Sequence, residues 1–109
     1  MEEVKVPEID FKEALDIVSQ NHKKLVWLGR EPVDYIRGLL ELKEDQMISV
    51  DVREIMEGAY PDYASLKDDV FVCYHGNTSR MVAKYLKTNR RIDAYSMKGG
   101  VTAVVGEIF

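Results

Sequence analysis

The sequence has almost no cysteine, and this scarcity excludes two kinds of structure. Cys73 is the only cysteine among 109 residues, so the chain has no internal disulfide and no cysteine-rich metal site. The two histidines, His22 and His75, lie far apart in the sequence and do not form a metal site by themselves. We therefore expect neither a structural metal nor a resident cofactor.

The chain also lacks the long apolar stretches that cross membranes. No run approaches the roughly 20 apolar residues that a spanning helix needs. The start, Met1-Glu2-Glu3, is acidic and does not resemble the basic first part of a secretory signal. With 46% hydrophobic residues, the chain is long enough for one well-packed core. We expect one cytoplasmic domain over residues 1–109, with no membrane partner.

An excess of positive charge is missing as well, because the net charge is −4. This charge, with no basic patch interleaved with aromatic residues, argues against a nucleic-acid partner. Acids nevertheless dominate residues 41–69 and cations dominate residues 80–98. Four of these cations share one face at helical spacing, namely Arg80, Lys84, Lys87 and Arg91. The face is either simply solvated or a basic rim that attracts a small anionic substrate or an acidic partner protein.

Strand patterns alternate with helix patterns along the chain, which predicts an α/β fold with a largely parallel central sheet flanked by helices. Strands are predicted over residues 4–6, 25–29, 47–50, 70–73 and 92–97, and helices after Asp10, Pro32, Asp51 and the loop that ends at Arg80. At positions 10 and 51, aspartate is followed three residues later by glutamate, which is the pattern of a capping box. Ligands of such folds bind at the carboxyl ends of the strands.

Cys73 lies at such an end. It follows the apolar run 70–72 and opens a loop that contains Tyr74, His75, Gly76, Asn77, Thr78, Ser79 and Arg80. The glycine lets the backbone turn around the sulfur, and the next helix directs its free N–H groups towards the same place. A lone strand-end cysteine is usually an inert core residue. The residues that follow Cys73 instead favour a reactive thiolate.

These features resemble the rhodanese family, specifically its small single-domain sulfurtransferases, over nearly the whole chain. Three segments carry the resemblance: Cys73–Arg80 is similar to the active-site loop, Lys98-Gly99-Gly100 to the paired glycines before the last helix, and Arg30-Glu31-Pro32 to the Arg-Glu-Pro after the second strand. The resemblance implies a rhodanese-like domain in which residues 101–109 form a helix, although their β-branched composition alone predicts a strand. It also implies that Cys73 takes sulfane sulfur from an anionic donor such as thiosulfate and passes it, as a persulfide, to cyanide or a thiol.

Roles for the neighbouring residues follow from this site. The backbone N–H groups of the loop hold negative charge on the sulfur. Thr78 and Ser79 either donate hydroxyl hydrogen bonds to the persulfide or cap the helix. Arg80 and Lys98 are candidates for binding the charge of the donor, and Arg30 is a candidate supporting residue. The two residues after Cys73 shape the entrance to the pocket.

Two segments compete for the Asp-Val-Arg-Glu motif of the family. Residues 51–54 match it letter by letter, but Asp51 lies only about twenty residues before Cys73. Arg30 lies 43 residues before Cys73 and follows an apolar strand, as the resemblance requires. We therefore interpret Arg30 as the motif arginine and Asp51 as a helix cap. Leu28 then replaces the usual aspartate of the family, and Leu39 replaces its usual histidine.

Two other functions stay open. A phosphatase or arsenate reductase on the same fold is disfavoured by loop length: six residues separate Cys73 from Arg80, against five in Cys-x₅-Arg phosphatases. The phosphatases that share the rhodanese fold have a loop one residue longer than the sulfurtransferase loop, which this chain resembles. A non-catalytic, partner-binding rhodanese-like module is the other alternative, because Leu28 and Leu39 depart from the family pattern.

Overall fold

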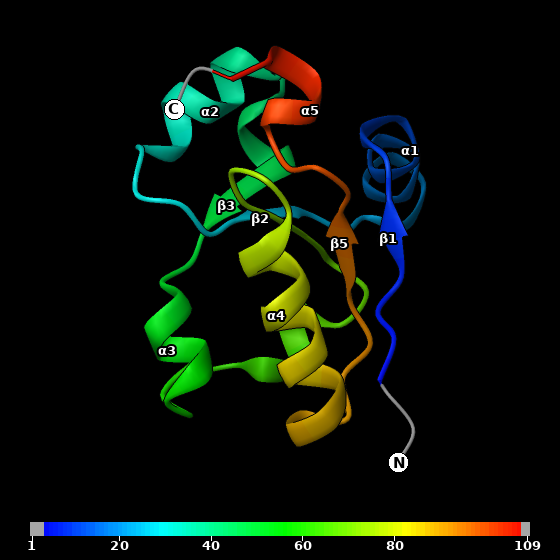
Figure 1. Cartoon of the computed structure of the whole chain (residues 1–109), viewed down its shortest axis with the longest axis vertical. Coiled ribbons are helices and arrows are strands. Elements are labelled where there is room, and N and C mark those ends of the chain that lie inside the picture. Colours follow the sequence, from blue (N-terminus) through cyan, green and yellow to red (C-terminus); the bar gives the residue numbers. More distant parts are fainter. Residues whose placement is uncertain (1–3, 108–109) are drawn as a thin grey trace.

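Five short parallel strands form the centre of the molecule (Figure 1). The computed structural model describes residues 4–107. Its strands are β1 (Glu8–Ile9), β2 (Leu25–Trp27), β3 (Met47–Ser49), β4 (Val70–Val72) and β5 (Tyr95–Met97), in the spatial order β1-β5-β4-β2-β3. All four neighbouring pairs are parallel, so the predicted α/β fold with a largely parallel sheet is confirmed.

Helices follow the strands, as the sequence pattern predicts. They are α1 (Phe11–Asn21), α2 (Val33–Leu39), α3 (Val52–Met56), α4 (Asn77–Tyr85) and α5 (Thr102–Val105), with the 3₁₀ turns η1 (Glu44–Gln46) and η2 (Tyr63–Leu66) and the π-helical turn η3 (Leu86–Arg90). None of the helices in residues 4–107 is long and apolar enough to cross a membrane.

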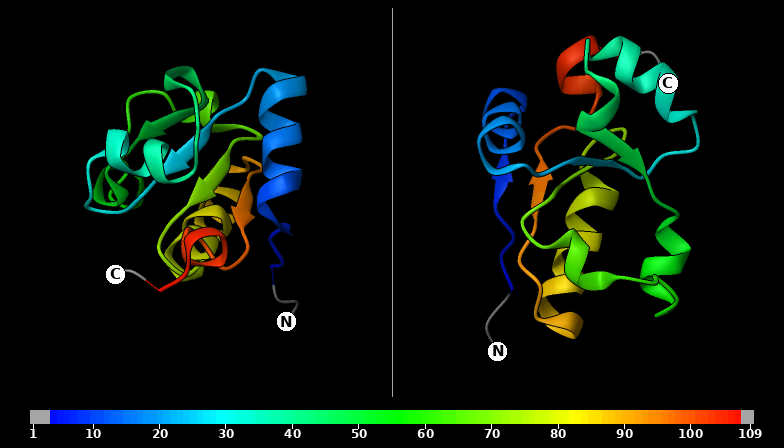
Figure 2. Two further views of the ribbon diagram at one scale, coloured as in Figure 1. Left: turned by 90° about the horizontal axis from the view of Figure 1, so that it is seen from above. Right: turned by 180° about the vertical axis from the view of Figure 1, so that it is seen from behind.

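Each face of the sheet has its own hydrophobic core. One core contains Ala14 of α1 and Ile36 of α2, which pack with alternate strand residues such as Trp27. The other contains Ile55 of α3 and Val82 of α4, with the strand residues that point the opposite way. Figure 2 shows α1 and α4 on different sides of the strands. Strands β2 and β4, in the interior of the sheet, are buried on both faces, which explains why their sequences are uninterrupted apolar runs.

Two of the predicted helix caps are present. A side-chain oxygen of Asp10 accepts a hydrogen bond from the Glu13 N–H over 2.8 Å at the start of α1. Asp51 accepts from the Arg53 N–H over 2.8 Å at the start of α3. Each such cap is worth about 1 kcal/mol. Asp51 is therefore a helix cap, as interpreted from the sequence.

The first predicted strand, residues 4–6, is wrong. The chain enters the sheet at Glu8 and Ile9, which pair with Ser96 and Met97 of β5. Pro7 precedes this pair; its carbonyl accepts from Ser96 N–H, but proline has no N–H with which to extend the ladder backwards. The register of the edge strand, not the apolar character of residues 4–6, decides where pairing begins.

Other boundaries also differ from the prediction. The last strand is shorter than residues 92–97, because α4 continues into the π-helical turn η3 and Arg91 adopts a left-handed conformation before β5. The strands predicted over residues 25–29 and 47–50 are also shorter, because β2 ends at Trp27 and β3 at Ser49. Within residues 101–109, a helix is present at Thr102–Val105, as the resemblance implies, whereas residues 108–109 lie outside the described residues.

Candidate active site

Cys73 lies at the carboxyl end of β4, where the chain turns into the N-terminus of α4. The residue is only 3% exposed, so the sulfur lies inside the turn and not on its outer surface. Gly76 permits the turn with a φ of 96°, a conformation that other residues rarely adopt. A Cβ atom at this position would also lie 3.0 Å from the backbone nitrogen of Gly99.

Two backbone N–H groups point at the sulfur. Gly76 donates to Cys73 Sγ over 3.1 Å, and Ser79 donates over 3.3 Å. Both groups belong to the N-terminus of α4, where N–H groups lack partners within the helix and the helix dipole is positive. The arrangement stabilises negative charge on the sulfur or on an atom bonded to it.

Two buried hydroxyl groups extend this network. Ser79 Oγ lies 3.5 Å from Cys73 Sγ, 3.2 Å from the Gly76 carbonyl and 2.7 Å from Ser96 Oγ. Both serines are fully buried. When Ser96 donates to Ser79, the single proton of Ser79 remains available for the Gly76 carbonyl or for the sulfur. Cys73 as a thiol donates a hydrogen bond to Ser79 Oγ, and Cys73 as a thiolate accepts one from the Ser79 hydroxyl.

The paired glycines hold the loop from the other side. Val101 N–H donates to the Cys73 carbonyl over 3.0 Å, and Thr102 N–H donates to the Tyr74 carbonyl over 3.1 Å. Gly100 has a φ of 62°, and a Cβ atom there would lie 2.4 Å from the Cys73 carbonyl oxygen and 2.5 Å from that of Tyr74. Only glycine permits this close approach, which explains the glycine at position 100.

Tyr74 ties the loop to the segment after β2. Its hydroxyl accepts from Arg30 N–H over 2.8 Å and donates to the carboxylate of Glu31. Its ring packs edge-on against Trp27 at 5.2 Å between centroids, and the Trp27 indole N–H donates to the Glu31 carbonyl over 2.9 Å. Burial, followed by the hydrogen bond to Glu31, raises the pKa of Tyr74 above its ordinary value. Tyr74 is thus a neutral anchor for the loop.

Some of the predicted loop residues do not contact the sulfur. His75 Nε2 lies 3.1 Å from a carboxylate oxygen of Glu107. The Arg80 guanidinium lies 3.4 Å from Glu8 of β1 and donates to the Asn77 side chain over 3.2 Å. The structure thus brings Gly76 and Ser79 to Cys73, and directs Arg80 towards β1.

The remaining predicted site residues lie around the loop. Thr78 is half-buried in the first turn of α4, and Lys98 is exposed directly after β5. Arg30 follows β2, and lines with Arg53 a cavity of about 730 Å³ at the carboxyl ends of β2 and β3. Leu28, which lines the same cavity, is buried in the hydrophobic core that contains Cys73. Both competing arginines therefore lie at the carboxyl edge of the sheet.

The basic face predicted at helical spacing is divided in the structure. Arg80 and Lys84 line one groove. Lys87 instead lies 3.8 Å from Asp93, and Arg91 lies beyond the helix with a φ of 56°. The π-helical turn changes the spacing after Tyr85, so that the four cations do not continue as one α-helical row.

Sequence reasoning missed the partners that support the loop. Ser96 carried a signal, since it is a small polar residue between Tyr95 and Met97 near the end of a predicted strand. Glu31 belongs to the Arg30-Glu31-Pro32 segment, but the contacts of Trp27 and Glu31 with Tyr74 could not be predicted, because they depend on how β2 and β4 pair. Across residues 4–107, no group of three or more histidine, cysteine, aspartate and glutamate side chains is placed to hold a metal ion.

Comparison with solved structures identifies the fold. A rhodanese homolog from the extremely thermophilic bacterium Thermus thermophilus superimposes with a TM-score of 0.65 at 19% sequence identity, over 89% of this chain and 99% of the other. A protein from Staphylococcus saprophyticus has a TM-score of 0.65 at 17% identity, over 94% of this chain and 97% of its own. A rhodanese-related protein from Thermoplasma volcanium has a TM-score of 0.56 at 19% identity, over 94% of each chain.

No family model matches the chain, and no curated protein matches it. The structural neighbours nevertheless cover most of the chain, and two of them are rhodanese homologs or rhodanese-related proteins. The chain therefore has the fold of a small rhodanese-like domain, with Cys73 at the carboxyl edge of its sheet.

Proposed function

We propose that this rhodanese-like domain is a sulfurtransferase that carries sulfane sulfur on Cys73. One observation carries the proposal: the N–H groups of Gly76 and Ser79 lie 3.1 Å and 3.3 Å from the only sulfur nucleophile of the chain. A site built in this way stabilises an anion before and after sulfur is added, without a separate base.

The first step loads the cysteine. The Cys73 thiolate attacks the outer sulfur of thiosulfate, and a new S–S bond forms. The original S–S bond of thiosulfate breaks, and sulfite leaves with its electron pair. The terminal sulfur of the resulting persulfide carries the negative charge. Hydrogen bonds from the loop stabilise that charge, which is the preorganised stabilisation found in oxyanion holes.

The second step unloads the sulfur. Cyanide attacks the outer sulfur of the persulfide, the S–S bond breaks, and the Cys73 thiolate leaves with the bonding electrons. The products are thiocyanate and the starting enzyme. A thiolate acceptor reacts in the same way and becomes a persulfide itself. We propose a thiol as the acceptor in the cell, because thiolates are strong nucleophiles towards disulfide-type sulfur.

Intact-mass measurement after incubation with thiosulfate tests the proposal. We expect the wild-type protein to gain the mass of one sulfur atom and to lose it again when cyanide is added. Cys73→Ser removes the nucleophile but keeps a residue of similar size, so we expect no gain in mass. A wild-type protein that gains no sulfur from any sulfane donor, or a mutant that gains it equally, would overturn the proposal and leave the partner-binding alternative.

Phosphate esters provide the contrasting substrate. We expect no turnover of an aryl phosphate, because the loop resembles the shorter class whose size suits sulfur. Hydrolysis that is present in the wild type and absent in Cys73→Ser would instead favour the phosphatase alternative.

A further inference from the structure

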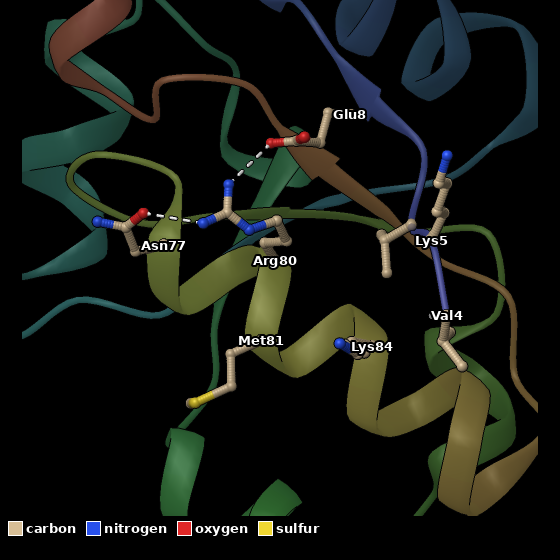
Figure 3. Close-up of a pocket in the computed structure, with 8 residues that line it drawn as sticks. Val4, Lys5, Glu8, Asn77, Arg80, Met81 and Lys84 are labelled. Atoms are coloured by element: carbon tan, nitrogen blue, oxygen red, sulfur yellow. Dashed lines mark hydrogen bonds and ion pairs between the residues drawn. The ribbon is translucent and has the colours of Figure 1, made fainter. Parts of the chain in front are cut away.

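A groove runs beside α4, outside the network that holds Cys73 (Figure 3). Its volume is about 450 Å³, and its other wall is the segment that leads into β1. The apolar residues that line it include Val4 and Val6 from that segment and Met81 from α4. Met81 is 47% exposed, although it is a large apolar residue. Methionine adapts its shape to irregular partners, which makes it a common residue of binding surfaces.

The groove is positively charged in a protein whose net charge is −4. Among the lining residues that the structure describes, Lys5, Arg80 and Lys84 are basic and Glu8 is the one acid. In Figure 3, Arg80 is directed towards Glu8, and their side chains lie 3.4 Å apart. Within residues 4–107, neither Lys5 nor Lys84 has a carboxylate within 4.0 Å. Two ammonium groups therefore remain available to an incoming anion.

The groove begins at the active-site loop. Asn77, which lines one end of it, directly follows the residue whose N–H holds the sulfur of Cys73. Lys84 lies seven residues further along α4, which corresponds to about 10 Å of helix. A peptide segment that lies along this helix is therefore long enough to contact Met81 and Lys84 while its end reaches the loop.

We propose that this groove docks an acidic segment of the protein that accepts sulfur from Cys73, with an apolar side chain of that segment on Met81. The two free ammonium groups and the exposed Met81 fit a segment that mixes carboxylates with apolar residues, whereas a small anion such as thiosulfate uses only the charge. The proposal rests on the proposed function for the acceptor role, but the docking itself does not require a reactive cysteine.

Binding of a synthetic peptide tests the docking directly. The probe is a fluorescein-labelled peptide in which glutamates alternate with leucines and which ends in cysteine; its control has lysine in place of each glutamate. Fluorescence anisotropy with the reduced wild-type protein should show binding of the acidic peptide only. Affinity should fall as salt rises from about 0.1 M to about 1 M, since the screening length shrinks from about 10 Å to about 3 Å.

Matched variants locate the binding site. Lys84→Glu reverses a charge inside the groove and should weaken binding about fivefold or more, whereas Lys87→Glu makes the same change one turn along the helix, outside the groove, and should weaken it less than about twofold. Met81→Ser should also weaken binding of the acidic peptide. Equal effects of Lys84→Glu and Lys87→Glu, binding of the lysine peptide, or no binding of the acidic peptide would overturn the proposal.

A second measurement separates docking from sulfur chemistry. Persulfide preloaded on Cys73 is offered to the acidic peptide thiol and to neutral 2-mercaptoethanol, and the ratio of the two rates is compared between variants. We expect Lys84→Glu to lower this ratio and Lys87→Glu to keep it. If the protein binds the peptide but takes no sulfur from thiosulfate, the proposed function fails and the docking surface stands. If the persulfide forms but the ratio is the same in all variants, the groove has no role with the acceptor.

The acidic residues 41–69 of a second copy of this chain are the other candidate occupant. Sedimentation of the wild type and of Lys84→Glu distinguishes the two. We expect both proteins to be of the same size in solution. Self-association of the wild type that Lys84→Glu abolishes would show that the groove binds a second copy, and would overturn the assignment to an acceptor.

Discussion

The two ends of the sheet treat buried polar groups in opposite ways. At the carboxyl end, Cys73 Sγ accepts hydrogen bonds from the N–H groups of Gly76 and Ser79, which favour negative charge. At the amino end, Asp69 is fully buried beside Lys24, with 3.2 Å between Asp69 Oδ2 and Lys24 Nζ. Burial raises the pKa of Asp69, and it outweighs the opposing effect of Lys24. The same sheet therefore favours an anion at one end and disfavours one at the other.

The cause lies in the topology. The N-terminus of α4 faces the carboxyl end of β4, so that free N–H groups and the positive end of the helix dipole meet at Cys73. At the amino end, Asp69 receives one backbone N–H from Lys24, over 3.2 Å, and a lysine side chain that is itself 32% exposed. One end is thus suited to chemistry on an anion, and the other to joining two strands.

The largest effect is expected from Gly100→Ala at the carboxyl end. The new methyl group would lie 2.4 Å from the Cys73 carbonyl oxygen, in a backbone conformation that alanine disfavours. We expect a loss of about 2 to 4 kcal/mol of unfolding free energy and a loss of most sulfur loading. Urea denaturation and intact mass measure the two. Gly38→Ala is the control, because a methyl group there meets open space; the same damage in both variants would contradict the account.

Ser96→Ala is expected to affect the reaction more than the fold. The variant removes the hydroxyl that lies 2.7 Å from Ser79 Oγ. Ser79 then loses the hydrogen bond that Ser96 donates in the arrangement that leaves the Ser79 proton available to the sulfur. We expect sulfur transfer to slow about tenfold, and the unfolding free energy to fall by about 1 kcal/mol. Ser65→Ala, in a serine that donates to the Asp62 carbonyl far from Cys73, is the matched control. An unchanged rate with reduced stability would make Ser96 a purely structural residue.

Asp69→Asn tests the amino end. The raised pKa means that the folded state holds the Asp69 proton more tightly than the unfolded state does. The contribution of this group is therefore fully present below the ordinary carboxyl pKa of about 4 and is lost as the pH rises through the raised value. The difference in unfolding free energy between wild type and Asp69→Asn should change with pH in this sense. Sulfur loading should be unchanged; a difference that is independent of pH would contradict the assignment.

Tyr74→Phe is expected to have the smallest effect. The variant keeps the ring on Trp27 but removes the hydroxyl that contacts Arg30 and Glu31. We expect about 1 kcal/mol less stability and a two- to threefold slower reaction, since the loop loses one anchor. The raised pKa of Tyr74 adds a test, because its contribution is present below about pH 10 and is lost above it. If the difference in unfolding free energy between wild type and Tyr74→Phe is the same at pH 11 as at pH 7, this contribution is excluded.

The sequence reveals those parts of the fold that depend on neighbouring residues. The buried central strands were predictable from apolar runs, and the caps at Asp10 and Asp51 from short spacing. The first strand was not, because Pro7 and the register with β5 select Glu8–Ile9 over the more apolar residues 4–6. The last helix was not predictable from propensity either, since its start is fixed by hydrogen bonds from Val101 and Thr102 to the loop.

The site divides in the same way. Cys73, Gly76 and Ser79 were predictable as a unit, because one continuous loop contains the nucleophile and both N–H donors. Ser96 joins them from a neighbouring strand, and this contact depends on the pairing of β4 with β5. The orientation of Arg80 depends on Glu8 of β1, a residue that lies outside the strand predicted over residues 4–6.

A crystal structure of the protein after treatment with thiosulfate would show whether Cys73 carries sulfur at the N-terminus of α4. We expect one additional sulfur atom bonded to Cys73 Sγ, within hydrogen-bonding distance of the loop N–H groups at the N-terminus of α4. Asp69, at the other end of the sheet, should keep its contact with Lys24. An unmodified Cys73, or an added sulfur that points away from these N–H groups, would contradict the claim that this end of the sheet is built to hold an anionic persulfide.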